Sequence, residues 1–189
     1  FRADHVGSYL RPKQLVDARE RHQEGSLGDD ELRAIEDTCI RDIVKRQEDL
    51  GLEGITDGEF RRTFFHTDFL QRLDGVTITT GAFTKAFRRD DGAEVGFRPP
   101  TMRVDGPIKH VEPIQGADFA YLASVVRGTP KVCIPAPSML HFRGGRAAID
   151  AEAYPDMEEF FAELADVYNQ EILALGDLGA RYLQLDDTN

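Results

Sequence analysis

The sequence predicts an α/β protein built on parallel strands. Five short apolar runs have strand character, at about residues 3–8, 53–58, 101–106, 131–135 and 181–186. Helix-like stretches separate most of them, and this alternation implies parallel strands joined by right-handed crossovers. Several runs end in polar clusters, which is how an α/β enzyme places its active site at the carboxyl ends of its strands.

The helices are predicted from the spacing of apolar residues and from their end signals. Pro12 opens a helix that runs to Gln23, because a proline in the first turn sacrifices no hydrogen bond. Asp29 or Asp30 can cap the next helix, which ends before Gly51. Further helical segments are predicted at about 62–73, 117–127 and 155–175.

Residues 75–100 break this alternation and predict a β-hairpin insertion or a mobile loop. The segment contains a strand-like run followed by a stretch rich in Gly, Arg and Phe. Arg88, Arg89 and Arg98 could meet an anionic substrate there, although a solvated hairpin explains them equally well.

The strand count leaves two architectures open. Five strands can complete a doubly wound sheet, whereas a (β/α)₈ barrel needs about eight strands for closure. Neither GxGxxG after the first strand nor GxxxxGK[ST] is present, so nothing supports a nucleotide-binding fold.

Composition and charge exclude several classes of partner. The net charge of −11 over 189 residues disfavours nucleic acid and anionic membranes, whose binding depends on basic side chains. No apolar run approaches the length of a transmembrane helix, and the first residues lack a signal-peptide pattern. Cys39 and Cys133 are interpreted as small buried hydrophobes without zinc-motif spacing, and such free thiols favour a cytoplasmic location.

The end of the first predicted strand is a candidate binding element. Gly7 lets a ligand approach the backbone, and the Ser8 hydroxyl can donate to a carboxylate. His5 lies beside them and joins the candidate site residues. A simple turn capped by serine is the alternative.

Acidic clusters follow the second and fifth strands. Glu59 and Arg61 lie in DGEFRR, where a carboxylate could hold an ammonium and an arginine could hold a carboxylate, as in recognition of a zwitterion. Asp186 and Asp187 alternate in facing, so one of them is expected to point into the site. Ser138, in the proline-rich loop after the fourth strand, could also line it. The chain stops two residues after Asp187, which leads us to expect a larger domain.

The ordered set of motifs resembles the catalytic domain of cobalamin-independent methionine synthases, and above all their short single-domain relatives. The likeness rests on residues 4–12 (DHVGSYLRP), 57–62 (DGEFRR) with 66–69 (HTDF), and 184–187 (QLDD). It implies a (β/α)₈ TIM barrel, of which residues 1–189 supply the N-terminal portion with about five strands and a β-hairpin insertion near 75–100.

The resemblance also implies a zinc-assisted activity. Such enzymes transfer a methyl group from a methylated folate, or in some relatives a corrinoid, to the thiol of homocysteine in methionine biosynthesis. Ser8 would contact the amino-acid end of homocysteine, and Glu59 and Asp186 would hold its ammonium. The family's zinc ligands, a His-x-Cys pair, a Glu and a later Cys, lie beyond Asn189 in the family's order. No metal ligand is therefore assigned in this chain, which is expected to be inactive by itself.

Two alternatives remain beside a 5-methyltetrahydropteroyltriglutamate–homocysteine S-methyltransferase-like enzyme. Another small thiol could replace homocysteine as the acceptor, or the chain could belong to a non-catalytic module that binds an amino acid. The expected partners are small molecules, with homo-oligomer formation left open.

Overall fold

The structure is a computed structural model that describes residues 3–79, 85–88, 94–97 and 100–187. The chain divides into two compact units. The first comprises Phe1–Phe65, Pro113–Ile134 and Ile172–Asp186. The second comprises His66–Glu112, Pro135–Glu171 and Asp187–Asn189.

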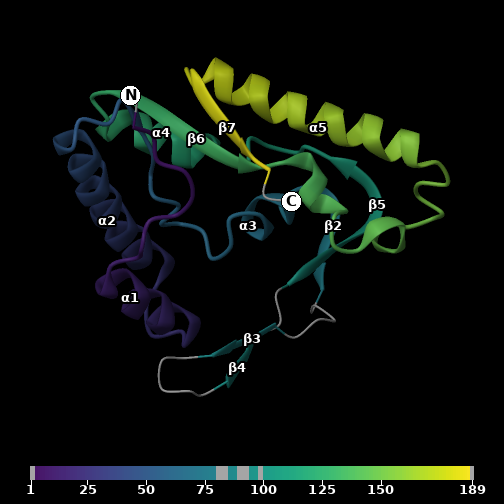
Figure 1. Cartoon of the computed structure of the whole chain (residues 1–189), viewed down its shortest axis with the longest axis horizontal. Coiled ribbons are helices and arrows are strands. Elements are labelled where there is room, and N and C mark those ends of the chain that lie inside the picture. Colours follow the sequence, from purple (N-terminus) through teal and green to yellow (C-terminus); the bar gives the residue numbers. More distant parts are fainter. Residues whose placement is uncertain (1–2, 80–84, 89–93, 98–99, 188–189) are drawn as a thin grey trace. The chain divides into compact units, whose positions relative to one another are not determined.

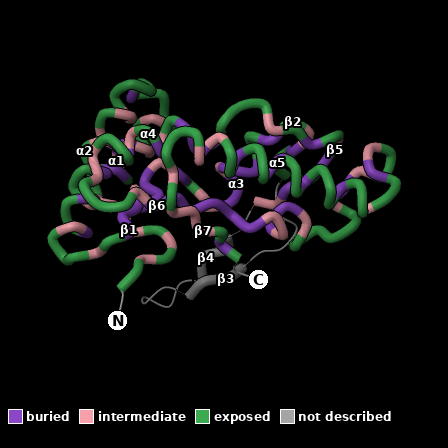
Figure 2. Tube along the Cα trace, turned by 90° about the horizontal axis from the view of Figure 1, so that it is seen from above, coloured by how far each residue is buried: buried purple, intermediate pink, exposed green. Residues whose placement is uncertain are grey.

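The first unit contains a parallel sheet, as the sequence predicts. Its strands are β1 (Gly54–Ile55), β6 (Thr129–Pro135) and β7 (Tyr182–Asp186), in the order β1-β6-β7. Strand β1 runs parallel to β6, with Gly54 opposite Thr129. Strand β6 is buried over most of its length (Figure 2), and β7 lies beside it (Figure 1). Such burial suits its run of Val, Cys and Ile, because strands covered on both faces are apolar throughout.

Three described helices lie wholly within this unit: α1 (Lys13–Gln23), α2 (Asp29–Asp49) and α4 (Gly116–Val125). Helices α1 and α2 pack against each other (Figure 1). The N-cap of α2 is Gly28 rather than Asp29 or Asp30. These two acids lie in the first turn, where their negative charges interact favourably with the positive end of the helix dipole. The helices and β1 share one core, formed by Leu15, Cys39, Ile40, Val44, Ile55, Phe60 and Leu122.

The predicted first strand is absent: residues 3–8 form no strand. Gly7 has a φ of 85°, which turns the chain, and His5 Nε2 donates a 2.7 Å hydrogen bond to the Gly7 carbonyl within this turn. The segment is fixed by the fully buried Lys131, whose ammonium donates to Asp4 Oδ2 and to the His5 carbonyl, both at 2.8 Å. Side chains, rather than a strand ladder, therefore hold this segment.

The second unit is built around antiparallel strands. Strand β2 (Asp74–Thr79) pairs with β5 (Thr101–Lys109), and β3 (Lys85–Arg88) pairs with β4 (Glu94–Phe97). Its short helical pieces are α3 (Thr67–Leu70), η1 (Pro137–Leu140) and η2 (Gly145–Ala148). Helix α5 (Met157–Asp177) begins here and continues into the first unit. The buried aromatic rings of Phe69 and Tyr168, 5.6 Å apart, contribute to its core.

A barrel with about five strands from this chain is not confirmed. Residues 101–106 belong to β5, which pairs with β2 and not with the parallel sheet. Buried and more exposed residues alternate along much of β5, as expected for an antiparallel strand with one covered face. The antiparallel β3–β4 pair does lie within residues 75–100, where the sequence predicts a hairpin. Arg89, Arg98 and the side chain of Arg88 lie outside the described residues.

Among the described helices, none combines the length and the apolar character needed to cross a membrane.

We expect the Lys131–Asp4 pair to stabilise the first unit. Asp4→Asn should lower the free energy of unfolding by about 1–2 kcal/mol, because a buried ammonium loses its countercharge. Lys131→Met should cost less, since an apolar side chain replaces the buried charge. Hydrogen bonds from Lys131 and Tyr182 lower the pKa of Asp4 from its ordinary 3.8. Its contribution is therefore complete above pH 3.8 and lost as the pH falls through the lowered value.

Urea denaturation of the three proteins between pH 7 and pH 3 tests this. The difference between wild type and Asp4→Asn should shrink at the acidic end. A difference that does not change with pH would contradict the assignment.

Candidate functional site

The loop after β1 has an unusual backbone conformation. Gly58 and Glu59 follow one another with φ values of 71° and 58°, and Glu59 is the one non-glycine residue with positive φ in the described part of the chain. A left-handed conformation costs such a residue roughly 1–2 kcal/mol. Local hydrogen bonds support the turn: Gly58 N donates to Thr56 Oγ1 at 3.1 Å, and Glu59 N donates to Asp57 Oδ1 at 2.9 Å. Strain of this kind is found where the surroundings fix a functional side chain.

Two arginines hold the carbonyl groups of this loop. Arg11 Nη2 donates to the Arg62 carbonyl at 2.5 Å and to that of Glu59 at 3.2 Å. Arg19, from α1, donates to the Arg62 carbonyl at 2.8 Å and to that of Phe60 at 2.5 Å. Because main-chain carbonyl oxygens accept these hydrogen bonds, they hold the loop backbone independently of what the loop side chains bind.

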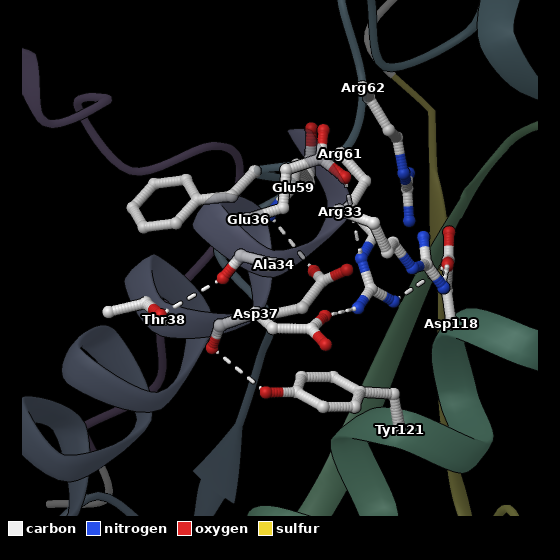
Figure 3. Close-up of polar contacts among 12 residues, drawn as sticks. Arg33, Ala34, Glu36, Asp37, Thr38, Glu59, Arg61, Arg62, Asp118 and Tyr121 are labelled. Carbon is white, nitrogen blue, oxygen red and sulfur yellow. Dashed lines mark hydrogen bonds and ion pairs between the residues drawn. The ribbon is translucent and has the colours of Figure 1, made fainter. Parts of the chain in front are cut away.

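A third arginine anchors the loop through its own side chain. Figure 3 shows Arg61 reaching toward the carboxylates of Asp37 on α2 and Asp118 on α4. Its Nη1 lies 2.8 Å from Asp118 Oδ1, and its guanidinium lies 4.6 Å from the centre of the Tyr121 ring. The side chain of Arg61 is only 4% exposed. This network joins both helices to the segment that carries Glu59.

The loop delivers Glu59 to a buried polar cluster. Ser8 Oγ donates a 2.6 Å hydrogen bond to Glu59 Oε2. One carboxylate oxygen each of Glu59 and Asp186 lies within 4.8 Å of the other and of Cys133 Sγ. Glu59, Cys133 and Asp186 are 2%, 4% and 7% exposed. The structure thus brings Ser8, Glu59 and Asp186 together from three distant parts of the chain.

The carboxylate of Glu59 is incompletely satisfied. Its Oε1 is buried and accepts no hydrogen bond from any described residue. Asp186 is held by the side-chain amide of Gln184. Two buried carboxylates at this distance repel one another, and burial adds a desolvation cost. A cation placed between them would relieve both effects.

Cys133 is a protonated thiol in this setting. Burial raises its pKa to about 12, and the negative charge of Asp186 acts in the same direction. The positive charges of Lys131 and Arg62 oppose the shift without reversing it. At neutral pH the thiol therefore adds no negative charge to the cluster.

The other predicted site residues are engaged in contacts outside this cluster or belong to the second unit. His5 stacks on Tyr9, with ring centres 3.6 Å apart, and donates to the Gly7 carbonyl. Arg61 is committed to its ion pairs. Ser138 lies in η1, in the second unit. Asp187 is exposed while Asp186 is buried, which agrees with the predicted alternation. The roles of these residues in substrate binding stay predictions.

Cys133 and Lys131 were not predicted from the sequence as members of the polar interior. Both lie on β6, two residues apart, so they share one face of the strand. The available signal was the lysine that begins the predicted strand 131–135, whose other residues are apolar or proline, because a buried lysine requires a partner.

Arg61 should be the main anchor of the loop. Arg61→Met should lower the free energy of unfolding by about 2–4 kcal/mol, because Asp37 and Asp118 lose a buried partner. Arg33→Met is the matched control: Arg33 also binds Asp118, at 3.0 Å, but its side chain is 43% exposed. It should cost less than about 1 kcal/mol. Equal losses in chemical denaturation would contradict an anchoring role specific to Arg61.

Neutralising Glu59 should stabilise the protein. Glu59→Gln removes one of two buried carboxylates and keeps an acceptor for Ser8, so the free energy of unfolding should rise by about 1–2 kcal/mol. Glu20→Gln on the exposed part of α1 serves as the control and should change it by less than about 0.5 kcal/mol. A clear loss of stability on Glu59→Gln would contradict this prediction, because it would show that favourable interactions outweigh the repulsion and desolvation of the Glu59 carboxylate in the folded protein.

Comparison with known proteins places this chain in a family. The profile of the family described as "Cobalamin-independent synthase, Catalytic domain" matches residues 1–189. The chain is 40% identical to the uncharacterised protein YxjH of Bacillus subtilis, over 100% of this chain and 48% of that protein. It is 27% identical to the methionine synthase of Sulfolobus acidocaldarius, over 96% of this chain and 50% of that protein.

A solved structure supports the same relationship. A putative vitamin-B12-independent methionine synthase from Listeria monocytogenes is 42% identical and superposes with a TM-score of 0.80, covering 100% of this chain and 52% of its own. The chain thus spans about half the length of the relatives named here. On the profile match over its whole length, this chain belongs to the cobalamin-independent synthase family, within the catalytic domain.

Proposed function

We propose that this chain forms the amino-acid-binding part of a methyltransferase that moves a methyl group from a methylated folate, or a related donor, to the thiol of homocysteine. The observation that carries the proposal is the convergence of Ser8, Glu59 and Asp186, with a buried carboxylate oxygen left without a partner. Family membership supplies the reaction class.

The two carboxylates suit the ammonium group of an amino acid. An ammonium carries three donors and one positive charge, and hydrogen bonds between charged partners are the stronger kind. Glu59 and Asp186 would share it. Ser8 acts on Glu59 by occupying Oε2, which leaves Oε1 for the ligand. The arginine-held loop keeps this arrangement in place before the substrate arrives.

The residue that binds the carboxylate of the substrate is proposed to differ from Arg61, the arginine predicted from the sequence. Arg61 would have to leave Asp37 and Asp118 to bind it. Arg62 is 4% exposed and donates through Nη2 to Gln115 at 3.3 Å, while its Nε and Nη1 have no partner among the described residues. Arg62 is therefore the better candidate for an anionic group, and His5 and Ser138 are retained as further substrate contacts.

Zinc belongs to the proposal through the family resemblance. Among the described side chains, one group has metal-type ligands close together: Glu59, Cys133 and Asp186. Two of these already serve the ammonium in our proposal, so we place the zinc of the reaction on residues beyond Asn189. Bound there, zinc would act as a Lewis acid that keeps the acceptor thiol as a thiolate.

We also propose that residues 1–189 are the N-terminal portion of a (β/α)₈ barrel and lack activity by themselves. Support comes from the span of about half of the relatives' length and from the parallel sheet β1-β6-β7. Transfer to another small thiol, or binding without catalysis, are the outcomes that the experiment must separate.

Ligand binding by the protein that contains this chain tests the ammonium site. Asp186→Asn should weaken homocysteine binding in calorimetry by about 100-fold, or about 2.7 kcal/mol, through loss of a charge-assisted hydrogen bond. Asp187→Asn, the neighbouring exposed acid, should leave the affinity unchanged. The deaminated analogue 4-mercaptobutanoate should bind weakly and should not distinguish wild type from Asp186→Asn.

Activity and metal content separate the remaining alternatives. Methyl transfer to homocysteine with stoichiometric zinc supports the full proposal, and transfer to another thiol alone would replace the acceptor. An intact protein that binds amino acids without zinc or methyl transfer would be a binding module. Equal effects of the Asp186 and Asp187 variants would contradict the site itself.

A further inference from the structure

We propose that Glu59, Cys133 and Asp186 form a second metal site that binds a thiophilic divalent cation, such as Zn²⁺ or Cd²⁺, and that this cation excludes the substrate's ammonium. The competition with the ammonium, though not the metal binding itself, rests on the proposed function.

The ligand atoms are close to metal-binding geometry. Two carboxylate oxygens and one sulfur lie within 4.8 Å of one another. Ligands of a tetrahedral zinc, at about 2.0–2.3 Å from the metal, lie about 3.5 Å apart. Side-chain adjustments of about an ångström would close the site around a cation, with a water or another small ligand as the fourth partner.

The site has a free ligand oxygen where a cation needs one. Glu59 is only 2% exposed. Its buried Oε1 nevertheless lacks a hydrogen-bond partner among the described residues. Ser8 holds the other oxygen of the same carboxylate, which restricts its rotation. The ligand is therefore oriented before the cation binds, on a loop that three arginines fix.

Among the described residues, no lysine or arginine side chain forms an ion pair with either carboxylate. Lys131 is paired with Asp4, at 2.8 Å. Arg62 donates its hydrogen bond to Gln115 rather than to Glu59 or Asp186. Two carboxylates thus remain for a ligand, and a divalent ion would neutralise both where an ammonium neutralises one.

Cys133 determines which cation is favoured. An ammonium requires acceptor oxygens and gains little from a thiol, which is a weak acceptor. A thiolate, in contrast, prefers soft or borderline ions over Mg²⁺ and Ca²⁺. Binding would replace the S–H bond of Cys133 by a sulfur–metal bond and release the proton to solvent. The cysteine therefore makes an amine pocket sensitive to thiophilic metals.

Titration of the full-length protein with Cd²⁺ tests the site. Ultraviolet difference spectra report the cadmium–thiolate bond, and elemental analysis gives the zinc already present. Wild type should bind one further equivalent with a thiolate band. Cys133→Ser should lose that band and at least tenfold in affinity. Cys39→Ser is the matched control, since Cys39 is equally buried but contacts Gln14 in the helical core, and it should behave as wild type.

A thiol-free amino acid, norvaline, tests the competition, because homocysteine itself would chelate cadmium. Saturating norvaline should weaken Cd²⁺ binding to wild type by at least tenfold. An unchanged cadmium–thiolate band in Cys133→Ser would overturn the metal site. So would loss of the single zinc required for methyl transfer in that variant, because the site would then be the reaction's own.

The two proposals fail in different ways. Cadmium binding at Cys133 without competition by norvaline would leave the metal site standing and contradict the ammonium assignment. Absence of cadmium binding, together with weakened homocysteine binding in Asp186→Asn, would do the reverse.

Discussion

The candidate site depends on one constraint: a carboxylate, that of Glu59, is buried beside a second one with an oxygen left unsatisfied. Such an arrangement is unfavourable in the unliganded protein, because desolvation and like-charge repulsion act together. It persists because the loop that carries Glu59 has no freedom to turn away. Arg11 and Arg19 bind its carbonyl groups, and Arg61 ties it to α2 and α4. The stability of the first unit thus maintains a locally unstable group.

This separation of roles explains why three arginines surround an acidic site without neutralising it. Their guanidinium groups bind main-chain oxygens or acids outside the cluster. Their charges therefore stabilise the surrounding fold and form no ion pair with Glu59 or Asp186. Ser8 contributes a neutral hydroxyl, which orients Glu59 and leaves its charge intact. In our proposal this arrangement preorganises the cluster for a cation, which would gain electrostatic energy between the two carboxylates.

The parts of the fold that were predicted correctly are those with local signals. The bounds of α1 and α2 follow from apolar periodicity and end residues, and the parallel character of the main sheet follows from alternating elements. The prediction of a strand at 3–8 was wrong. This segment has few apolar residues, and the hydrogen bond from Lys131 to Asp4 holds it in place of strand pairing. Residues 101–106 do form a strand, but its partner is β2. A local sequence pattern does not indicate which strand a segment pairs with.

By itself, the sequence determined the α/β class and indicated Ser8, Glu59 and Asp186 as candidate site residues, because residue type and order carry this information. Only the tertiary structure decided that these side chains meet, that Cys133 joins them, and that Arg61 faces Asp37 and Asp118. Contacts between positions up to 178 residues apart depend on packing and pairing geometry, as the Tyr182–Asp4 hydrogen bond does. The left-handed conformation of Glu59 is a result of that packing, since nothing in its residue type favours it.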